Sequence, residues 1–231
     1  MVMSTSVRSR EAITTLRPPL WLRIGFWACI VIAVGAVLRR LVALASPVRA
    51  GPPDLVALDT YFATHSLLTL IHIVPALAFV ALAPLIYLRR FATVSWLERA
   101  LFPLGGIVGL TAYAMSTHAI GGWLERSAVL LFNTLFLYAL GRSFSYRRLG
   151  QRFLQLQWLT RAIGILLGIA TTRPVMGIFF ATSPLTHLRP SQFFGIAFWI
   201  GFSINTLIVE WWVRSQRGQS ALEWVVEQRQ A

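Results

Sequence analysis

The sequence contains no lysine, a single cysteine and few acidic residues. All 21 basic residues are arginine, and the 8 acidic residues leave a net charge of +13. Because Cys29 is alone, an intramolecular disulfide and a zinc site built from several thiolates are both excluded. Charged residues make up 13% of the chain, whereas soluble domains carry roughly 25%. The chain is therefore too apolar for an ordinary soluble domain.

Several catalytic motifs are also missing. The sequence has no HExxH zinc motif, no Walker loop, no GxSxG nucleophile turn and no GxGxxG dinucleotide fingerprint. These absences remove the sequence evidence for four common enzyme classes.

Long apolar runs take up most of the chain, whose mean hydropathy is +0.66. A membrane span needs about 20 mostly apolar residues, and helices satisfy their own peptide groups in lipid. We therefore predict an all-α, polytopic transmembrane helix bundle of about six spans. The runs are Pro19–Leu38, Tyr61–Leu88, Ala100–Ile120, Ser127–Leu140, Leu159–Phe180 and Phe193–Val213.

The arginines alternate between rich and poor segments along the chain. The rich segments hold Arg8, Arg10, Arg17 and Arg23; Arg89, Arg90 and Arg99; Arg142, Arg147, Arg148, Arg152 and Arg161; and Arg214, Arg217 and Arg229. The poor segments hold Arg39, Arg40, Arg49, Arg126 and Arg189. The positive-inside rule then places both termini in the cytoplasm.

This distribution predicts a multi-pass protein of the cell membrane, most simply the bacterial cytoplasmic (inner) membrane. The arginines suit anionic lipid heads of the bilayer, and no basic stripe on a soluble fold suggests nucleic acid. The Arg39–Arg40 pair does not follow the alternation. A cleaved signal peptide ending near Ala43–Ala45 is the competing interpretation.

The predicted organisation is a cytoplasmic tail at residues 1–18, a transmembrane domain at 19–215 and a cytoplasmic tail at 216–231. Ser220–Gln230 forms either an amphipathic helix on the inner leaflet or a solvated tail. The GxxxG pairs Gly105–Gly109 and Gly164–Gly168 predict close helix packing.

Polar residues inside spans mark candidate sites, because they are costly in lipid. His65 and His72 begin the second predicted span, two helical turns apart and on one face. His118 ends the third span, and Arg173 lies in the outer half of the fifth. The predicted orientation places all four in the same leaflet, together with His187 in the following loop.

Each of these residues also has a structural explanation. His65 and His118 fit an interfacial position, His72 fits an interhelical hydrogen bond, and Arg173 fits a side chain reaching the interface. Asn133 and Asn205 are predicted to join helices, and Glu210 to pair with Arg214. The outer half is predicted to hold no carboxylate within a span, which disfavours a carboxylate proton relay.

Two segments carry a family resemblance. The first resembles the HIxPG…GPLQF motif and consists of His72–Ala76 with Leu82–Leu85. The second resembles the WMxR…R motif and consists of Trp158–Arg161 with Arg173. Both motifs belong to a domain-of-unknown-function family of multi-pass membrane proteins. The resemblance implies that His72, Arg161 and Arg173 are the characteristic polar positions. Gln155 stands where that family usually has histidine, and the HRxxGR motif after the second span is absent. The resemblance implies no reaction.

Several functions remain open at this point. One is binding or carriage of a small or lipophilic anionic compound by Arg173, His72, His65, His118 and Arg161. A second is a redox protein with haem b held by His65 and His118. A third is an intramembrane enzyme with His72 as general base, and a fourth is a membrane subunit without chemistry. The sequence does not indicate the oligomeric state.

Overall fold

The computed structural model describes residues 18–46, 53–87 and 95–230, and it is all-α, 91% helical and without strands in that part of the chain. Residues 1–17 of the predicted tail at 1–18, Arg49, and Arg89–Arg90 lie outside the described residues. The helices are α2 (Leu20–Ala45), α3 (Pro53–Thr64), α4 (Ser66–Leu82), α5 (Ser95–Ser116), α6 (Gly122–Arg148), α7 (Arg152–Leu166), α8 (Gly168–Thr186) and α9 (Pro190–Gln230). A 3-10 turn, Ala83–Tyr87, extends α4.

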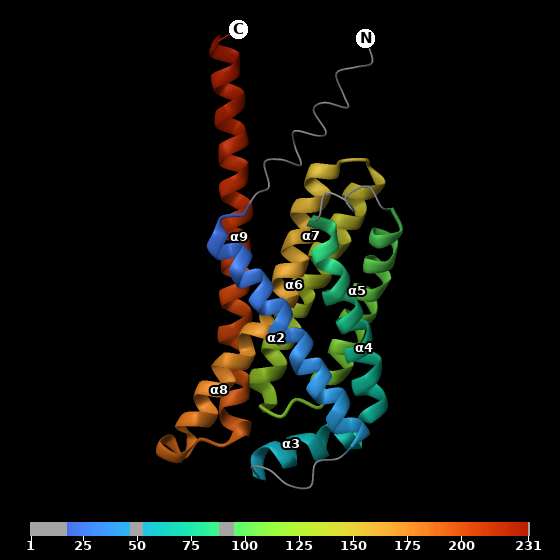
Figure 1. Cartoon of the computed structure of the whole chain (residues 1–231), viewed down its shortest axis with the longest axis vertical. Helices are drawn as coiled ribbons and strands as arrows, with labels where there is room; N and C mark the ends of the chain where they lie inside the picture. Colours follow the sequence, from blue (N-terminus) through green and yellow to red (C-terminus); the bar gives the residue numbers. More distant parts are fainter. Residues whose placement is uncertain (1–17, 47–52, 88–94, 231) are drawn as a thin grey trace.

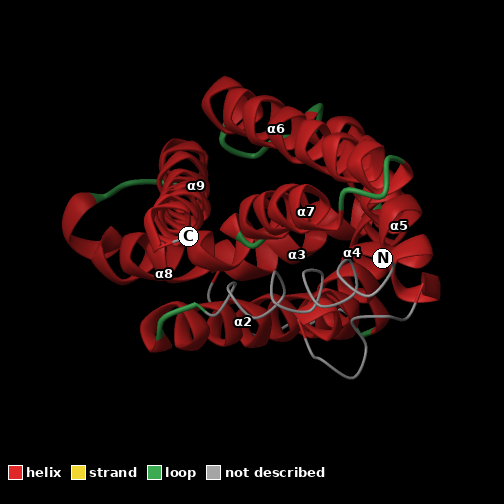
Figure 2. Ribbon diagram, turned by 90° about the horizontal axis from the view of Figure 1, so that it is seen from above, coloured by secondary structure: helices red, strands yellow, loops and turns green. Residues whose placement is uncertain are grey.

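The helices form one bundle around α7. Seen from above, α7 lies in the middle, with α6 on one side and α2 on the other (Figure 2). Nine of its fifteen residues are buried. The short helix α3 lies across one end of the bundle, while the start of α2 and the end of α9 lie at the opposite end (Figure 1). The cavity described below lies in the half of the bundle that α3 covers.

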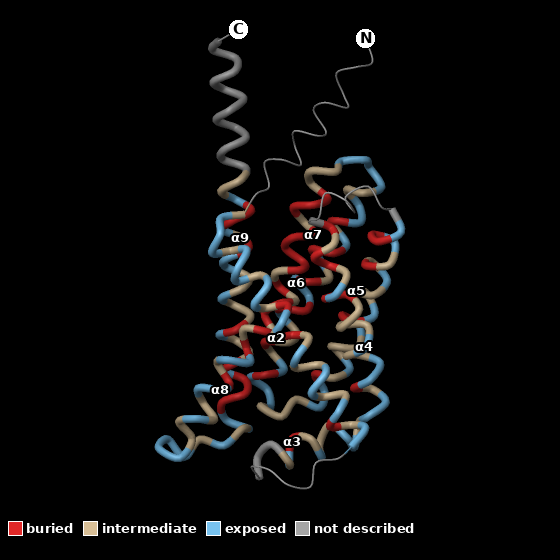
Figure 3. Tube along the Cα trace, in the orientation of Figure 1, coloured by how far each residue is buried: buried red, intermediate tan, exposed pale blue. Residues whose placement is uncertain are grey.

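Five helical segments in the described residues are long and apolar enough to cross a membrane, which is the architecture of a membrane protein. They are Leu20–Ala45, Ser66–Ile86, Gly122–Arg148, Arg152–Thr186 and Pro190–Gln216. Large apolar side chains cover the outer faces, among them Leu110 at 67% exposure and Leu207 at 69%. The buried residues instead gather in the interior, on α6 and α7 (Figure 3). Such apolar outer faces suit lipid and not water.

The glycine pairs allow the close packing that their spacing predicts. A Cβ atom at Gly105 would lie 2.7 Å from Leu140, and one at Gly168 would lie 2.5 Å from Phe202. Both distances are shorter than a carbon–carbon contact allows. The absence of a side chain therefore sets the spacing of α5 to α6 and of α8 to α9.

Some helices are longer than the apolar runs. The predicted fourth span, Ser127–Leu140, is part of the 27-residue helix α6, whose ends carry charged residues. The helix α8 continues to Thr186, so the loop before α9 is shorter than predicted. The helix α9 runs without interruption from Pro190 to Gln230.

Asparagines join helices as predicted. The Asn133 Nδ2 group donates to the carbonyl of Gly109 on α5 at 2.8 Å. The Asn205 Nδ2 group donates to the carbonyl of Gly164 on α7 at 3.4 Å, and its Oδ1 atom accepts from Thr171 at 2.6 Å.

Candidate ligand-binding cavity

A cavity of about 330 Å³ lies between the helices in the half of the bundle that α3 covers. This volume is within the range of small-molecule sites. Its polar lining consists of Arg39, Arg40, Thr69, His72, Ser116, His118, Glu125, Asn133 and Arg173. The rest of the lining is mostly apolar, and four phenylalanines, Phe132, Phe136, Phe198 and Phe202, belong to it.

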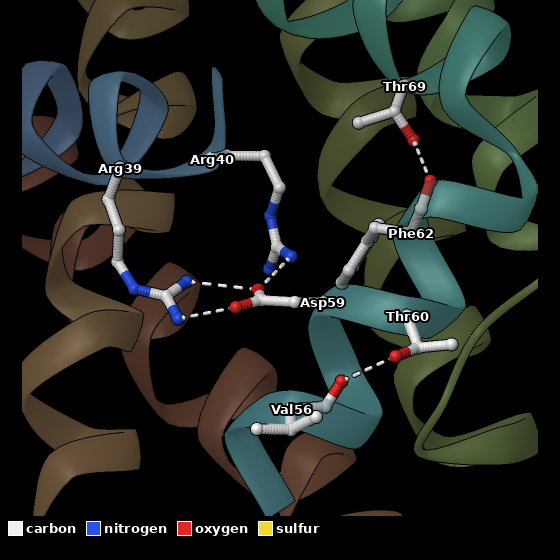
Figure 4. Close-up of polar contacts among 7 residues, drawn as sticks. All are labelled: Arg39, Arg40, Val56, Asp59, Thr60, Phe62 and Thr69. Atoms are coloured by element: carbon white, nitrogen blue, oxygen red, sulfur yellow. Dashed lines mark hydrogen bonds and ion pairs between the residues drawn. The ribbon is translucent and has the colours of Figure 1, made fainter. Parts of the chain in front are cut away.

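Two arginines and an aspartate connect α2 to α3 at the charged end of the cavity (Figure 4). Arg39 donates to both carboxylate oxygens of Asp59, at 3.2 and 2.9 Å, and Arg40 donates to Oδ1 at 2.6 Å. The Arg40 guanidinium also lies 4.0 Å from the ring centre of Phe62. The Arg39 side chain is 51% exposed, whereas Arg40 is 14% and Asp59 10% exposed. Arg39 therefore marks the rim, and Arg40 belongs to the interior.

Arg173 is the cation of the cavity that has no ion-pair partner within 4 Å among the described residues. It lies on α8 just before Pro174, in the predicted span, and it lines the cavity with an exposed side chain. Its guanidinium has five N–H donors and stays charged at any physiological pH. An exposed guanidinium without an ion-pair partner, in a cavity whose lining is mostly apolar, is suited to a carboxylate or a phosphate.

Glu125 corrects the prediction that the outer half lacks a carboxylate within a span. It lies in the first turn of α6, is 9% exposed and lines the same cavity. Its Oε2 atom accepts the backbone N–H of Gly121 at 2.6 Å. The prediction was wrong because the apolar run begins at Ser127, whereas the helix begins at Gly122.

The charged residues at this end do not balance. Three arginines, Arg39, Arg40 and Arg173, stand against two carboxylates, Asp59 and Glu125. When both carboxylates are ionised, the charged end therefore keeps an excess of one positive charge. The unbalanced charge favours an anion in the cavity.

His65 and His118 lie together, as their common level in the predicted spans indicates. Their ring centroids are 4.1 Å apart in an edge-on arrangement, and the Tyr61 hydroxyl donates to the carbonyl of His118 at 2.8 Å. His118 lines the cavity, whereas His65 is not one of its lining residues.

This contact does not fit the haem b hypothesis. Axial imidazoles stand on opposite faces of a porphyrin with each nitrogen about 2 Å from the metal, so their rings cannot touch. Separately from haem, the described residues hold no group of three or more His, Cys, Asp or Glu side chains that could bind a metal ion.

His72 lies deeper in the cavity and contacts α5. Its Nδ1 atom is 2.9 Å from the Thr111 hydroxyl, and the carbonyl of Val108 is a second hydrogen-bond partner of the ring. The interhelical bond confirms the structural explanation for His72. His72 also lines the cavity, so a ligand there could contact it.

Arg161 is not among the lining residues of the cavity. It is 7% exposed on α7, and its Nε and Nη2 groups donate to Glu210 on α9 at 2.7 and 3.2 Å. Glu210 also accepts from Arg214 at 2.7 Å, which confirms the predicted pair. Arg161 thus holds α7 against α9.

His187 ends α8 in a left-handed conformation with φ of 54° and is exposed. It is not one of the cavity-lining residues.

Sequence reasoning missed the part of Asp59, Glu125 and the Arg39–Arg40 pair in this cavity. The Arg39–Arg40 pair did not follow the alternation of arginine-rich and arginine-poor segments, and this exception was the one sequence feature that could have indicated a charged site there. A charged pair at a span end that breaks the charge rule is explained by a partner, which here is Asp59.

No protein-family model matches this chain, and no curated protein or solved structure matches it. The family resemblance of the His72 and Arg173 segments therefore stays a prediction.

Proposed function

We propose that this protein binds, and in its membrane carries, an anionic amphiphile in the cavity, with the anionic group on Arg173 and Arg40. The observation that carries the proposal is Arg173, an arginine in a largely apolar cavity without an ion-pair partner in the described residues. A charge in such a place is costly unless something neutralises it. A ligand carboxylate or phosphate supplies that neutralisation.

The remainder of the cavity supports an apolar ligand body. Beyond the charged end, Phe132, Phe136, Phe198 and Phe202 provide aromatic surface that an inorganic anion would leave unoccupied. The excess of one positive charge matches a monoanion. Together these features favour a molecule with one charged end and a hydrocarbon body, such as a long-chain carboxylate.

We further propose six spans with both termini in the cytoplasm of a bacterium, so that the ligand enters from the outer leaflet. The sixth span is α5, whose 22 residues suffice to cross a bilayer. Two observations support this orientation: the placement of the arginine-rich segments, and the fact that α2 begins and α9 ends at the same end of the bundle (Figure 1). Reporter fusions test it: one after Tyr146 reports cytoplasm, and one after Pro53 reports the exterior. The reverse pattern overturns the orientation.

Ligand binding is tested by thermal unfolding of the purified protein, followed by the fluorescence of its nine tryptophans. Stearate is the anionic probe, and methyl stearate has the same hydrocarbon chain without the charge. We expect stearate to raise the melting temperature and methyl stearate to leave it nearly unchanged.

Substitutions assign the contact. Arg173→Leu should abolish the stearate shift, Arg173→Lys should retain part of it, and Arg126→Leu is the matched control. Arg126 is exposed on α6 and lies 5.7 Å from the Trp123 ring centre, and it is not a cavity-lining residue. An equal shift by stearate and its ester, or a full shift in Arg173→Leu, rejects the proposed function.

A further inference from the structure

The imidazole of His72 presents a hydrogen-bond acceptor to the cavity. The Thr111 hydroxyl has carbonyl acceptors of its own, Ile107 at 2.7 Å and Val108 at 3.1 Å. The Val108 carbonyl, which can only accept, is also a partner of the His72 ring, so we assign the tautomer in which Nδ1–H faces α5. In a neutral imidazole one nitrogen donates and the other accepts. With Nδ1–H directed at α5, Nε2 keeps its lone pair on the other side of the ring.

Asn133 presents a second acceptor. Only the amide nitrogen can donate to a carbonyl, so the bond from Asn133 to Gly109 fixes Nδ2 against α5. The Oδ1 atom is then the part of this side chain that remains to accept a hydrogen bond. Asn133 is 8% exposed and lines the cavity.

The two acceptors lie at the same depth. His72 and Asn133 reach α5 from its two neighbours, at Thr111 and Gly109, which are two residues and about 3 Å apart along the helix axis. Measured along α6, Asn133 is eight residues, about 12 Å, beyond Glu125 at the charged end, so both acceptors lie roughly 10 Å from that end.

The hydroxyl groups of the lining do not supply donors to these atoms. The Thr69 hydroxyl donates to the carbonyl of His65 at 3.0 Å, and the Ser116 hydroxyl donates to the carbonyl of Tyr113 at 2.7 Å. In the described residues no side chain donates to His72 Nε2 or to Asn133 Oδ1. Polar groups in an apolar cavity require a partner, and here the missing partner is a donor.

We propose that the ligand carries a hydroxyl group part-way along its hydrocarbon body, about 10 Å from its anionic end, and that His72 and Asn133 accept its hydrogen bond. This inference rests on the proposed function, since it takes the anionic end to be at Arg173. The substrate class is a mid-chain hydroxylated amphiphilic anion, and His72 and Asn133 determine its specificity.

The test is competition for bound radiolabelled stearate in nanodiscs of uncharged phosphatidylcholine. The competitors are 10-hydroxystearate, with its hydroxyl in mid-chain, 2-hydroxystearate, with its hydroxyl beside the carboxylate, and unlabelled stearate. Each competitor partitions into the lipid equally in all variants. A change in the ratio of two competitors' affinities from one variant to another therefore reports on the cavity.

We expect 10-hydroxystearate to bind about tenfold more tightly than the other two, as one net hydrogen bond allows. His72→Leu and Asn133→Leu should each reduce that preference, measured within each variant as the ratio of 10-hydroxystearate affinity to stearate affinity. Asn205→Leu is the matched control, because Asn205 also joins helices but does not line the cavity.

The outcomes separate the two proposals. Equal affinities of the three competitors in the wild-type protein, with binding that needs Arg173, overturn the hydroxyl inference alone and indicate that water fills the acceptor sites. The same holds if the preference survives in both leucine variants. If none of the three binds, or binding does not need Arg173, both proposals fail. The wild-type comparison needs no variant, so the inference stays testable even if His72→Leu does not fold.

Discussion

Replacing Asp59 by asparagine should destabilise the protein and tighten anion binding at the same time. Asp59→Asn keeps the size of the side chain and removes the charge that Arg39 and Arg40 share. The contact between α2 and α3 is then weakened, and the charged end of the cavity gains one unit of positive charge. The two effects have opposite consequences for the apo protein and for the complex.

The size of each effect follows from the geometry. The Arg40–Asp59 pair is mostly buried, and breaking such a pair costs about 3–5 kcal/mol. The Arg39 pair is half exposed and contributes about 1 kcal/mol or less. Because the asparagine side chain still accepts a hydrogen bond, we expect a loss near the lower end of the first range, about 3 kcal/mol. An anion bound by Arg40 shares that guanidinium with Asp59, so the two negative charges lie about 7 Å apart. At an effective dielectric constant of about 20, removing their repulsion contributes about 2.4 kcal/mol, or roughly fiftyfold in affinity.

Thermal unfolding of the apo protein measures the first effect, and stearate binding in nanodiscs measures the second. Arg39→Gln is the control, since it removes only the exposed partner and should change stability little. An Asp59→Asn protein with unchanged stability would mean that the pair does not hold α3. Weaker stearate binding would mean that Asp59 orients the arginines for the ligand and does not compete with it.

Two further predictions concern the rest of the bundle. Glu210→Gln should lower the free energy of unfolding by about 2–3 kcal/mol, because the buried Arg161 of α7 loses its counter-charge but keeps a hydrogen-bond acceptor. Arg214→Gln should change it by about 1 kcal/mol or less. Denaturation in mild detergent compares the two variants, and equal losses would contradict this. Gly168→Ala should lower the free energy of unfolding by about 1–3 kcal/mol, because the added Cβ atom would clash with Phe202 on α9. Gly177→Ala is the control and should be neutral, because a Cβ atom there meets no other atom within 4 Å. Equal melting temperatures of the two variants would refute the close-packing argument.

The sequence was sufficient for the helical class and for the membrane character, because apolar length and arginine placement are local features. It also placed His65 beside His118, since both fall at one end of neighbouring spans. It did not reveal Glu125 in the cavity, because a carboxylate at the end of an apolar run looks interfacial until α3 covers that end. Nor did it show that Arg161 pairs with Glu210, 49 residues later. Contacts between distant segments depend on helix rotation, which periodicity alone leaves open.

The position of α7 has a consequence for how the protein is made. This helix buries Gln155, Gln157 and Arg161, and the carboxylate that neutralises Arg161 belongs to α9. Leaving a buried arginine without its counter-charge costs about 3–5 kcal/mol. During synthesis α7 emerges before Glu210, so in a nascent chain that ends earlier Arg161 lacks this counter-charge. We therefore expect the central helix of the bundle to reach its final position only after the last helix is complete, so that the order of assembly differs from the order of translation.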